Sequence, residues 1–108
     1  MIRRRSRFGE LVDRQLALFA VDEADLLEEA EAALDAWRGS GRESAEEAYG
    51  DYQLAVDAIA DRLLDIRESY ATTLAAGDDD EYRHALGRAV ARRFRAHPSV
   101  VADLAEPG

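Results

Sequence analysis

Glu81 and His84 are the two residues whose types and spacing come closest to a reactive site. Their E-x-x-H spacing places a carboxylate and an imidazole on one face of a helix, as in di-iron carboxylate bundles. A complete site needs a second such motif and glutamates from other helices, which a symmetric dimer could supply through Glu28 or Glu31. Negative charge at a helix start is already explained by the helix dipole. We therefore keep Glu81 and His84 only as weak metal candidates, in a carboxylate-bundle alternative.

Other catalytic chemistry finds no support in the residue types. The chain of 108 residues has no cysteine and two histidines, so it offers neither a thiolate zinc site nor a cysteine nucleophile. No serine stands in a recognisable nucleophile motif, and the glycines do not form a phosphate-binding loop. We predict a protein that is not an enzyme, with no catalytic residue and no cofactor.

Basic side chains are concentrated locally, although the chain as a whole is acidic. It carries 14 basic and 23 acidic side chains, a formal charge of −9. Residues 82–97 contain five arginines and no acid, and Arg88, Arg92 and Arg95 follow a helical stripe with His84. Such a stripe could bind phosphates in a salt-dependent way. Because the acidic remainder repels the same phosphates, nucleic-acid association is an alternative and not the main prediction.

Three segments have the apolar spacing of helices. The strongest is about 45–75, in which large residues alternate steps of three and four: Tyr49, Tyr52, Val56, Ile59, Leu63, Ile66, Tyr70 and Thr73. Ser44 has the S-x-x-E spacing of a capping box at its start, and Gly77 is placed to end it. The flanking helices are predicted over about 8–38 and 79–96.

The first predicted helix is interrupted on its apolar stripe. Glu23 is the single polar residue there, and Asp22 has the sequence context of a helix N-cap. We expect one continuous helix with a kink, and a break at Asp22 is the alternative. Arg93 lies about one layer away in the last helix, so a Glu23–Arg93 pair would satisfy both side chains. Extension of each head group to water is equally compatible with the pattern.

Antiparallel pairing of the helices is consistent in register. In an antiparallel helical hairpin, the residue numbers of two facing residues add up to nearly the same total for every pair. The pairs of the first two helices, such as Trp37 with Tyr49 and Leu34 with Tyr52, share one sum. Because the central helix offers its stripe to both neighbours, we predict an all-α fold. Its arrangement would be up-down-up and antiparallel, with three helices built on a long helical hairpin.

The last predicted helix covers little more than half of the central one. Its length is about 27 Å, against about 45 Å for the central helix. Leu34, Trp37, Tyr49 and Tyr52, near the first turn between helices, would then lack a third wall. An exposed apolar end is typical of an interface. We therefore predict a homodimer, with these four residues and the arginine stripe as interaction residues.

The chain divides into a basic N-terminal tail (1–7), a single helical domain (8–97) and a C-terminal tail (98–108). The N-terminal tail holds four arginines, which the nucleic-acid alternative would use. No run approaches the ~18 apolar residues that a membrane span needs, and the absence of cysteine fits a reducing cytoplasm. The predicted function is a small cytoplasmic protein–protein interaction or structural module, with no membrane partner.

Overall fold

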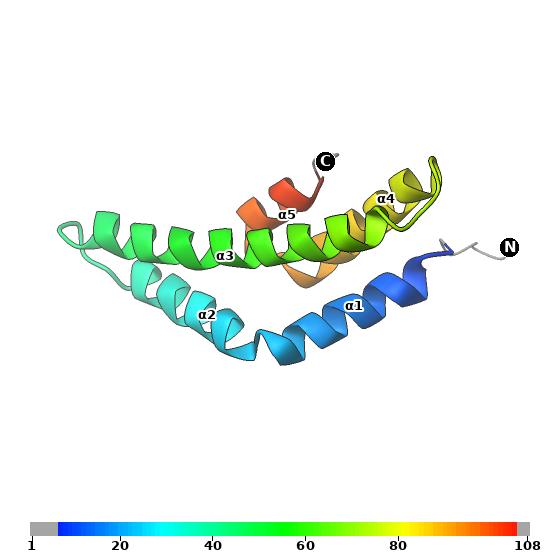
Figure 1. Ribbon diagram of the computed structural model, residues 1–108. Coiled ribbons are helices and arrows are strands. Elements are labelled where there is room, and N and C mark those ends of the chain that lie inside the picture. The colour runs from blue at the N-terminus through cyan, green and yellow to red at the C-terminus, as the bar shows by residue number, and fades with distance from the viewer. Residues whose placement is uncertain (1–6, 106–108) are drawn as a thin grey trace, which may run out of the picture.

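The computed structural model describes residues 7–105, and every regular element in that range is a helix (Figure 1). Its five helices are α1 (Gly9–Asp22), α2 (Ala24–Arg38), α3 (Ala45–Ala71), α4 (Asp78–Arg93) and α5 (Pro98–Ala105). No strand occurs within residues 7–105. The all-α prediction is confirmed, whereas the up-down-up arrangement of three helices is not.

The long helix α3 is the element against which most of the others pack. Its stripe of Tyr52, Val56, Ile59 and Leu63 is buried, as the spacing predicts. Ser44 is the N-cap, but its side chain makes no capping hydrogen bond, so the predicted capping box is wrong.

The end of α3 also differs from the prediction. The helix stops at Ala71 and not near residue 75. The hydroxyl groups of Thr72 and Thr73 donate hydrogen bonds to the carbonyls of Ser69 and Tyr70, at 3.1 and 2.7 Å. These local bonds compete with continued helix formation.

A bend at Glu23 separates α1 from α2, so the expected continuous first helix is wrong (Figure 1). Backbone bonding carries on across the bend: the Glu23 amide donates to the carbonyl of Phe19, and the Glu23 carbonyl accepts from the amide of Leu27. Glu23 has φ −112° and ψ 30°, which turns the helix axis. It also occupies the N-cap of α2, without a side-chain bond, where the alternative placed Asp22.

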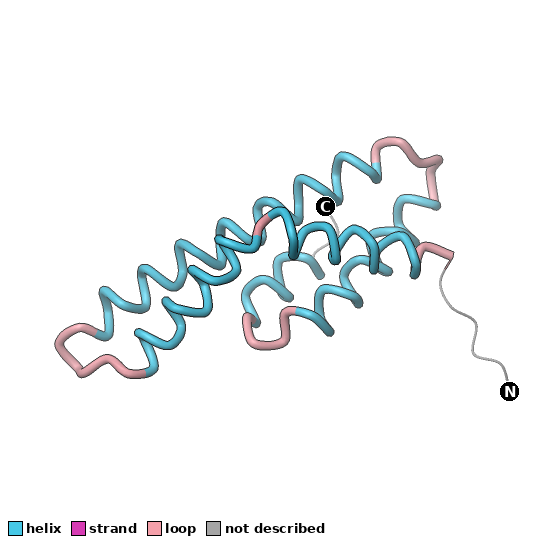
Figure 2. Tube along the Cα trace, turned by 90° about the horizontal axis from the view of Figure 1, so that it is seen from below, coloured by secondary structure: helices cyan, strands magenta, loops and turns pink. Residues whose placement is uncertain are grey.

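This bend decides which helices pack together. α2 packs along α3 as an antiparallel hairpin, whereas α1 diverges from α3 and packs against α4 (Figures 1 and 2). The predicted register is seen in the hairpin, where the rings of Trp37 and Tyr49 are 4.8 Å apart. It does not extend to α1, because the bend takes α1 away from the second half of α3.

The segment expected to be a C-terminal tail contains α5, which packs on both α3 and α4. Val100 and Leu104 on α5 are buried, with 0% and 2% of their surface exposed. Gly87 on α4 permits this approach, because a Cβ there would lie 3.2 Å from the carbonyl oxygen of Leu104. α4 itself ends at Arg93, three residues earlier than predicted.

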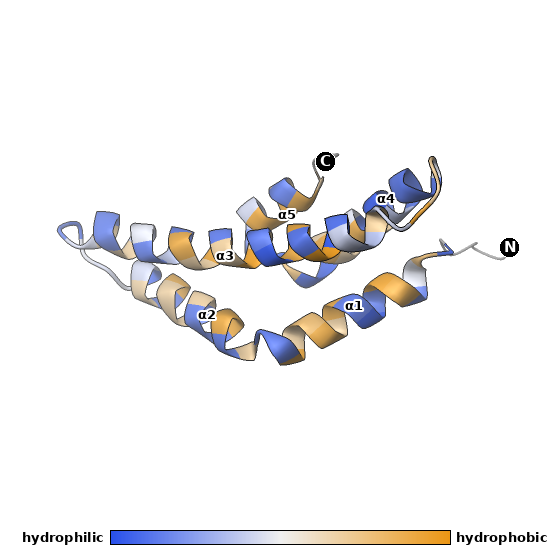
Figure 3. Ribbon diagram, viewed as in Figure 1, coloured by the Kyte–Doolittle hydropathy of each residue, from blue (hydrophilic) through white to orange (hydrophobic). Residues whose placement is uncertain are grey.

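Apolar residues are interspersed with polar ones along the helices (Figure 3), and the buried apolar side chains form one core cluster. Ile59, Leu63, Tyr82, Leu86 and Val90 have 0% exposure and form the centre of the core. The turn end of the α2–α3 hairpin projects past the other helices, in a molecule that measures 50 × 33 × 24 Å (Figures 1 and 2). This hairpin therefore has surfaces that no other helix within residues 7–105 covers.

Candidate interaction surfaces

The four apolar residues expected at an interface divide into two groups. Leu34 and Tyr52 are buried within the single chain, at 8% and 7% exposure. Trp37 and Tyr49 are 36% and 45% exposed. Trp37 stacks on Tyr52 with ring centres 5.9 Å apart and an interplanar angle of 14°. Only Trp37 and Tyr49 therefore remain accessible to a partner.

His97, in the turn before α5, packs against Tyr52, on the side where the sequence predicted no covering element. The Tyr52 hydroxyl and His97 Nδ1 share a buried hydrogen bond of 2.8 Å. His97 is 6% exposed, and burial lowers its pKa, with a smaller opposing influence from Glu31. Burial likewise raises the pKa of Tyr52. Because the sequence placed residue 97 at a simple helix end, it gave no signal for this contact.

A shallow groove follows the outer face of the α2–α3 hairpin, and we call it the alanine groove. Its volume is about 480 Å³, and its lining consists of Leu26, Glu29, Ala32, Ala33, Ala36, Ala48, Asp51, Leu54, Ala55 and Ala58. Leu54 projects from it with 71% of its surface exposed. Small side chains allow a second helix to approach closely. Helical spacing places Leu54 off the buried stripe, which is the signal that the sequence offered.

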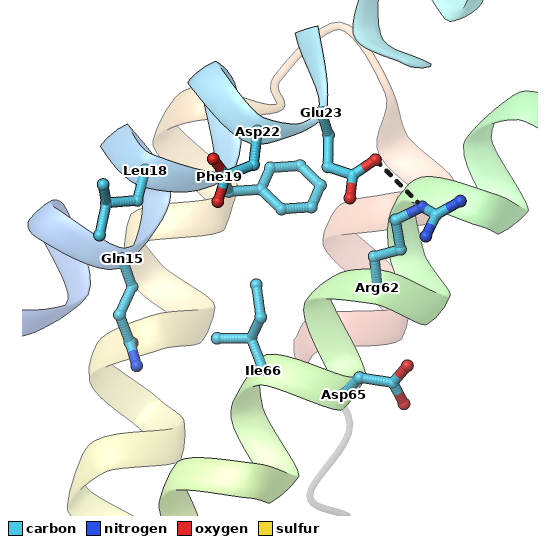
Figure 4. Close-up of a pocket in the computed structure, with 8 residues that line it drawn as sticks. All are labelled: Gln15, Leu18, Phe19, Asp22, Glu23, Arg62, Asp65 and Ile66. Atoms are coloured by element: carbon cyan, nitrogen blue, oxygen red, sulfur yellow. Dashed lines mark ion pairs between the residues drawn. The ribbon is translucent and has the colours of Figure 1, made fainter. Parts of the chain in front are cut away.

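A second groove lies between α1 and α3, where the bend separates the two helices, and we call it the α1–α3 groove (Figure 4). Its volume is about 450 Å³, and it is lined by Gln15, Leu18, Phe19, Asp22, Glu23, Arg62, Asp65 and Ile66. Helical periodicity alone does not indicate this groove, because a continuous first helix would have left no gap beside α3.

Glu23 forms its ion pair at the end of this groove, and its partner is Arg62 on α3. The Arg62 Nε lies 3.3 Å from Glu23 Oε1 (Figure 4). The Glu23–Arg93 pair, one of the two arrangements that the sequence left open, is therefore not formed. Arg93 is exposed and lines a separate hollow of about 230 Å³ beside Glu31.

A charged network joins the end of α3 to α4. The Arg67 Nε donates to Glu68 Oε2 at 2.8 Å, and the guanidinium of Arg83 pairs with the same oxygen. Arg67 is 4% exposed although it is charged. The hydrogen bonds from Arg83 and Arg67 lower the pKa of the Glu68 carboxyl. This network fixes α4 against α3 and accounts for these side chains structurally.

The stripe of His84, Arg88, Arg92 and Arg95 is exposed, as helical spacing predicts. Its proposed use in binding phosphates stays a prediction. Glu81, the other half of the E-x-x-H motif, has its carboxylate 3.6 Å from the guanidinium of Arg7. Within residues 7–105, no group of three or more histidines, aspartates or glutamates is arranged to hold a metal ion. The geometry thus adds no ligand to Glu81 and His84.

None of the helices between residues 7 and 105 is both long and apolar enough to cross a bilayer. Comparisons with protein-family models, with curated proteins and with solved structures find no match to this chain.

Proposed function

We propose that this protein is a helical interaction module that forms a homodimer through the alanine groove of its α2–α3 hairpin. One observation carries the proposal: a leucine with 71% exposure stands beside a groove in which six of the ten lining residues are alanine, on a hairpin that projects from the core. A pair of helices with an uncovered apolar face gains stability when two further helices cover it.

A second copy fits this surface because the projecting Leu54 and the alanine groove lie on the same face of the hairpin. In a two-fold symmetric dimer, the same patch is used by both copies, so each must be complementary to itself. Leu54 of either copy can then enter the alanine groove of the other. Two hairpins joined in this way form a four-helix bundle, in which a leucine packs among small residues of the facing helices.

The rim of the groove opposes this association electrostatically. Glu29 and Asp51 are the two charged residues in its lining, and both are acidic. Like charges that approach across an interface repel one another, and salt screens the repulsion over about 10 Å at 0.1 M. The proposed dimer is therefore held by apolar contact against a charge penalty, and salt strengthens it.

Light scattering coupled to size-exclusion chromatography tests the proposal. Wild-type protein in 0.3 M salt, where the Debye length is only about 6 Å, should have twice the 12.0 kDa mass of one chain. Leu54→Glu should return the mass to that of a monomer, because two carboxylates would enter the apolar contact.

Leu18→Glu is the matched control for this experiment. Leu18 is also an exposed leucine on a helix, with 57% exposure, but it lies on α1 and outside the alanine groove. The control should remain dimeric. A wild-type mass of 12.0 kDa at submillimolar concentration, or an equal effect of the two substitutions, would overturn the proposal.

A further inference from the structure

We infer that the α1–α3 groove is a docking site for a basic amphipathic helix of a partner protein. This surface is separate from the alanine groove, and the two linings share no residue. The inference therefore stands or falls independently of the homodimer. It rests on the shape of the groove, on exposed apolar side chains along it, and on the charge of its rim.

The shape of the groove suits a helix. Phe19 is buried at its floor, Ile66 is half-buried beside it, and Leu18 is 57% exposed on the α1 side. The hollow continues past Ile66 to Ser69 and Tyr70 on α3. From Arg62 to Tyr70 the groove follows about 12 Å of α3, which matches two turns of a docked helix. Helices that dock in grooves use anchors three, four and seven residues apart, and this length accommodates that spacing.

The charge of the rim selects the partner. Three carboxylates line the groove, those of Asp22, Glu23 and Asp65, against the single guanidinium of Arg62. The exposed Asp57 and Asp61 lie further along α3. A rim of this sign attracts cations and steers a basic partner toward the groove. Lysines or arginines that flank an apolar anchor would meet Asp22 on one side and Asp65 on the other.

The ion pair between Glu23 and Arg62 is of the same kind as the ion pair that a basic partner would make with Glu23. Arg62 and Glu23 are held 3.3 Å apart, with 53% and 28% of their side chains exposed. A guanidinium from a partner therefore competes with Arg62 for Glu23. Removal of the Arg62 charge should release Glu23 for binding and strengthen the affinity for a basic helix. This makes Arg62 a specificity-determining residue of the groove.

Two other occupants fit the groove less well. Nucleic acid would bring phosphates against three carboxylates, which repel them. The second half of α4 in another copy supplies arginines, but the first turn of that helix is acidic. Among residues 7–105 the large exposed apolar side chains lie on α1, α2 and α3, not on α4. α4 therefore has no anchor for the apolar floor. A helix with both features must come from another protein.

Fluorescence anisotropy with a synthetic peptide tests this inference. The probe is a labelled helix of about five turns, with leucines on one face and arginines on the other. Its control is a peptide of the same composition whose sequence is shuffled to remove the apolar face. The amphipathic peptide should bind wild-type protein at least tenfold more tightly than the shuffled one. Higher salt should weaken its binding, because salt screens the charge attraction.

Variants locate the binding on this groove. Leu18→Gln and the double variant Asp22→Asn with Asp65→Asn should each weaken binding about tenfold, which is the loss of one strong contact. Leu54→Gln, on the other groove, should leave it unchanged. Arg62→Gln should strengthen binding several-fold. Circular dichroism checks that each variant is folded. If Leu18→Gln does not fold, the double variant Asp22→Asn with Asp65→Asn still tests the groove.

Several results would overturn the inference. Equal binding of the amphipathic and shuffled peptides, or unchanged binding by the groove variants, would mean that the acidic surface attracts any basic peptide. A large increase in affinity on deletion of residues 1–6 would mean that this arginine-rich segment fills the groove itself. A change in mass on Leu18→Gln would mean that a second copy fills it.

Discussion

The Tyr52–His97 hydrogen bond is the polar contact that ties the α2–α3 hairpin to the turn before α5. It joins residues 45 positions apart, through an imidazole that is 6% exposed. A buried imidazole is more costly to protonate than one in water. The contact therefore makes the stability of the protein sensitive to mild acid.

The first prediction concerns this pH dependence. Burial lowers the pKa of folded His97 below its ordinary value of about 6.5. The unfolded chain then binds the proton more tightly, so stability is complete above pH 6.5 and falls as the pH is lowered toward the folded pKa. Urea denaturation at several pH values should show this fall, and His97→Gln should remove it. His84→Gln is the control, since His84 is exposed. A fall of equal size in His97→Gln would contradict the role of His97.

The second prediction concerns loss of the Tyr52 hydroxyl, the other partner in the hydrogen bond with His97. Tyr52→Phe keeps the ring that stacks on Trp37 but leaves His97 Nδ1 without its partner. The loss should cost about 1–3 kcal/mol of unfolding free energy, the penalty for an unsatisfied buried polar group. Tyr49→Phe is the control, because Tyr49 is 45% exposed. Equal midpoints for wild type and Tyr52→Phe in urea would show that the bond does not contribute.

At the scale of elements, the bend at Glu23 and the close approach of α5 determine the shape of the fold. The bend directs α2 onto α3 and α1 onto α4. The approach of α5 favours glycine at position 87, because a Cβ there would make a tight contact with the Leu104 carbonyl oxygen. Gly50 on α3, by contrast, has open space around the position of a Cβ.

The third prediction compares these two glycines. Gly50→Ala should raise the unfolding free energy by about 0.5–1 kcal/mol, because alanine favours helix and meets no neighbour there. Gly87→Leu should lower it by at least about 1–3 kcal/mol, because overpacking displaces α5 and exposes Val100 and Leu104. Urea denaturation measures both. Opposite signs are the expected result, and a stabilised Gly87→Leu would mean that α5 is not packed as described.

Helix periodicity predicts a helix well where one apolar stripe is buried. It predicts the helix bounds less well where packing between helices determines them. Tyr52, Val56, Ile59 and Leu63 lie in the core as their spacing indicates. The break at Glu23 depends on a backbone turn that its local sequence made only an alternative. α5 was missed because Val100 and Leu104 are too few to define a period. The α1–α3 groove depends on how two helices diverge, which no local pattern contains, whereas the alanine groove was indicated only by the position of Leu54 off the buried stripe.

At the scale of the whole molecule, charge distinguishes the two proposed kinds of association. The chain carries a formal charge of −9, and both grooves have acidic rims. Self-association brings these negative surfaces together, whereas a basic helix brings opposite charges together. Salt screens the repulsion between the two copies and also the attraction between the groove and the basic helix. The two kinds of association should therefore respond to salt in opposite directions.

The fourth prediction is this opposite response. Between about 0.05 and 0.5 M salt, where the Debye length falls from about 14 to about 4 Å, the homodimer should become tighter. The basic peptide should bind more weakly over the same range. Sedimentation equilibrium measures the first affinity and anisotropy the second. A homodimer that dissociates as salt rises would mean that its interface is formed by opposite charges, and so does not involve the alanine groove.

The most direct test of the homodimer is to observe which side chains meet across two copies. In a sample that mixes isotope-labelled and unlabelled chains, nuclear Overhauser effects can be restricted to contacts between copies. The proposal predicts such effects from the Leu54 methyls of one copy to alanine methyls of the alanine groove, such as those of Ala33 and Ala58, in the other. Contacts between copies that arise instead from Leu18 and Ile66, or a dimer without any contact at Leu54, would contradict it.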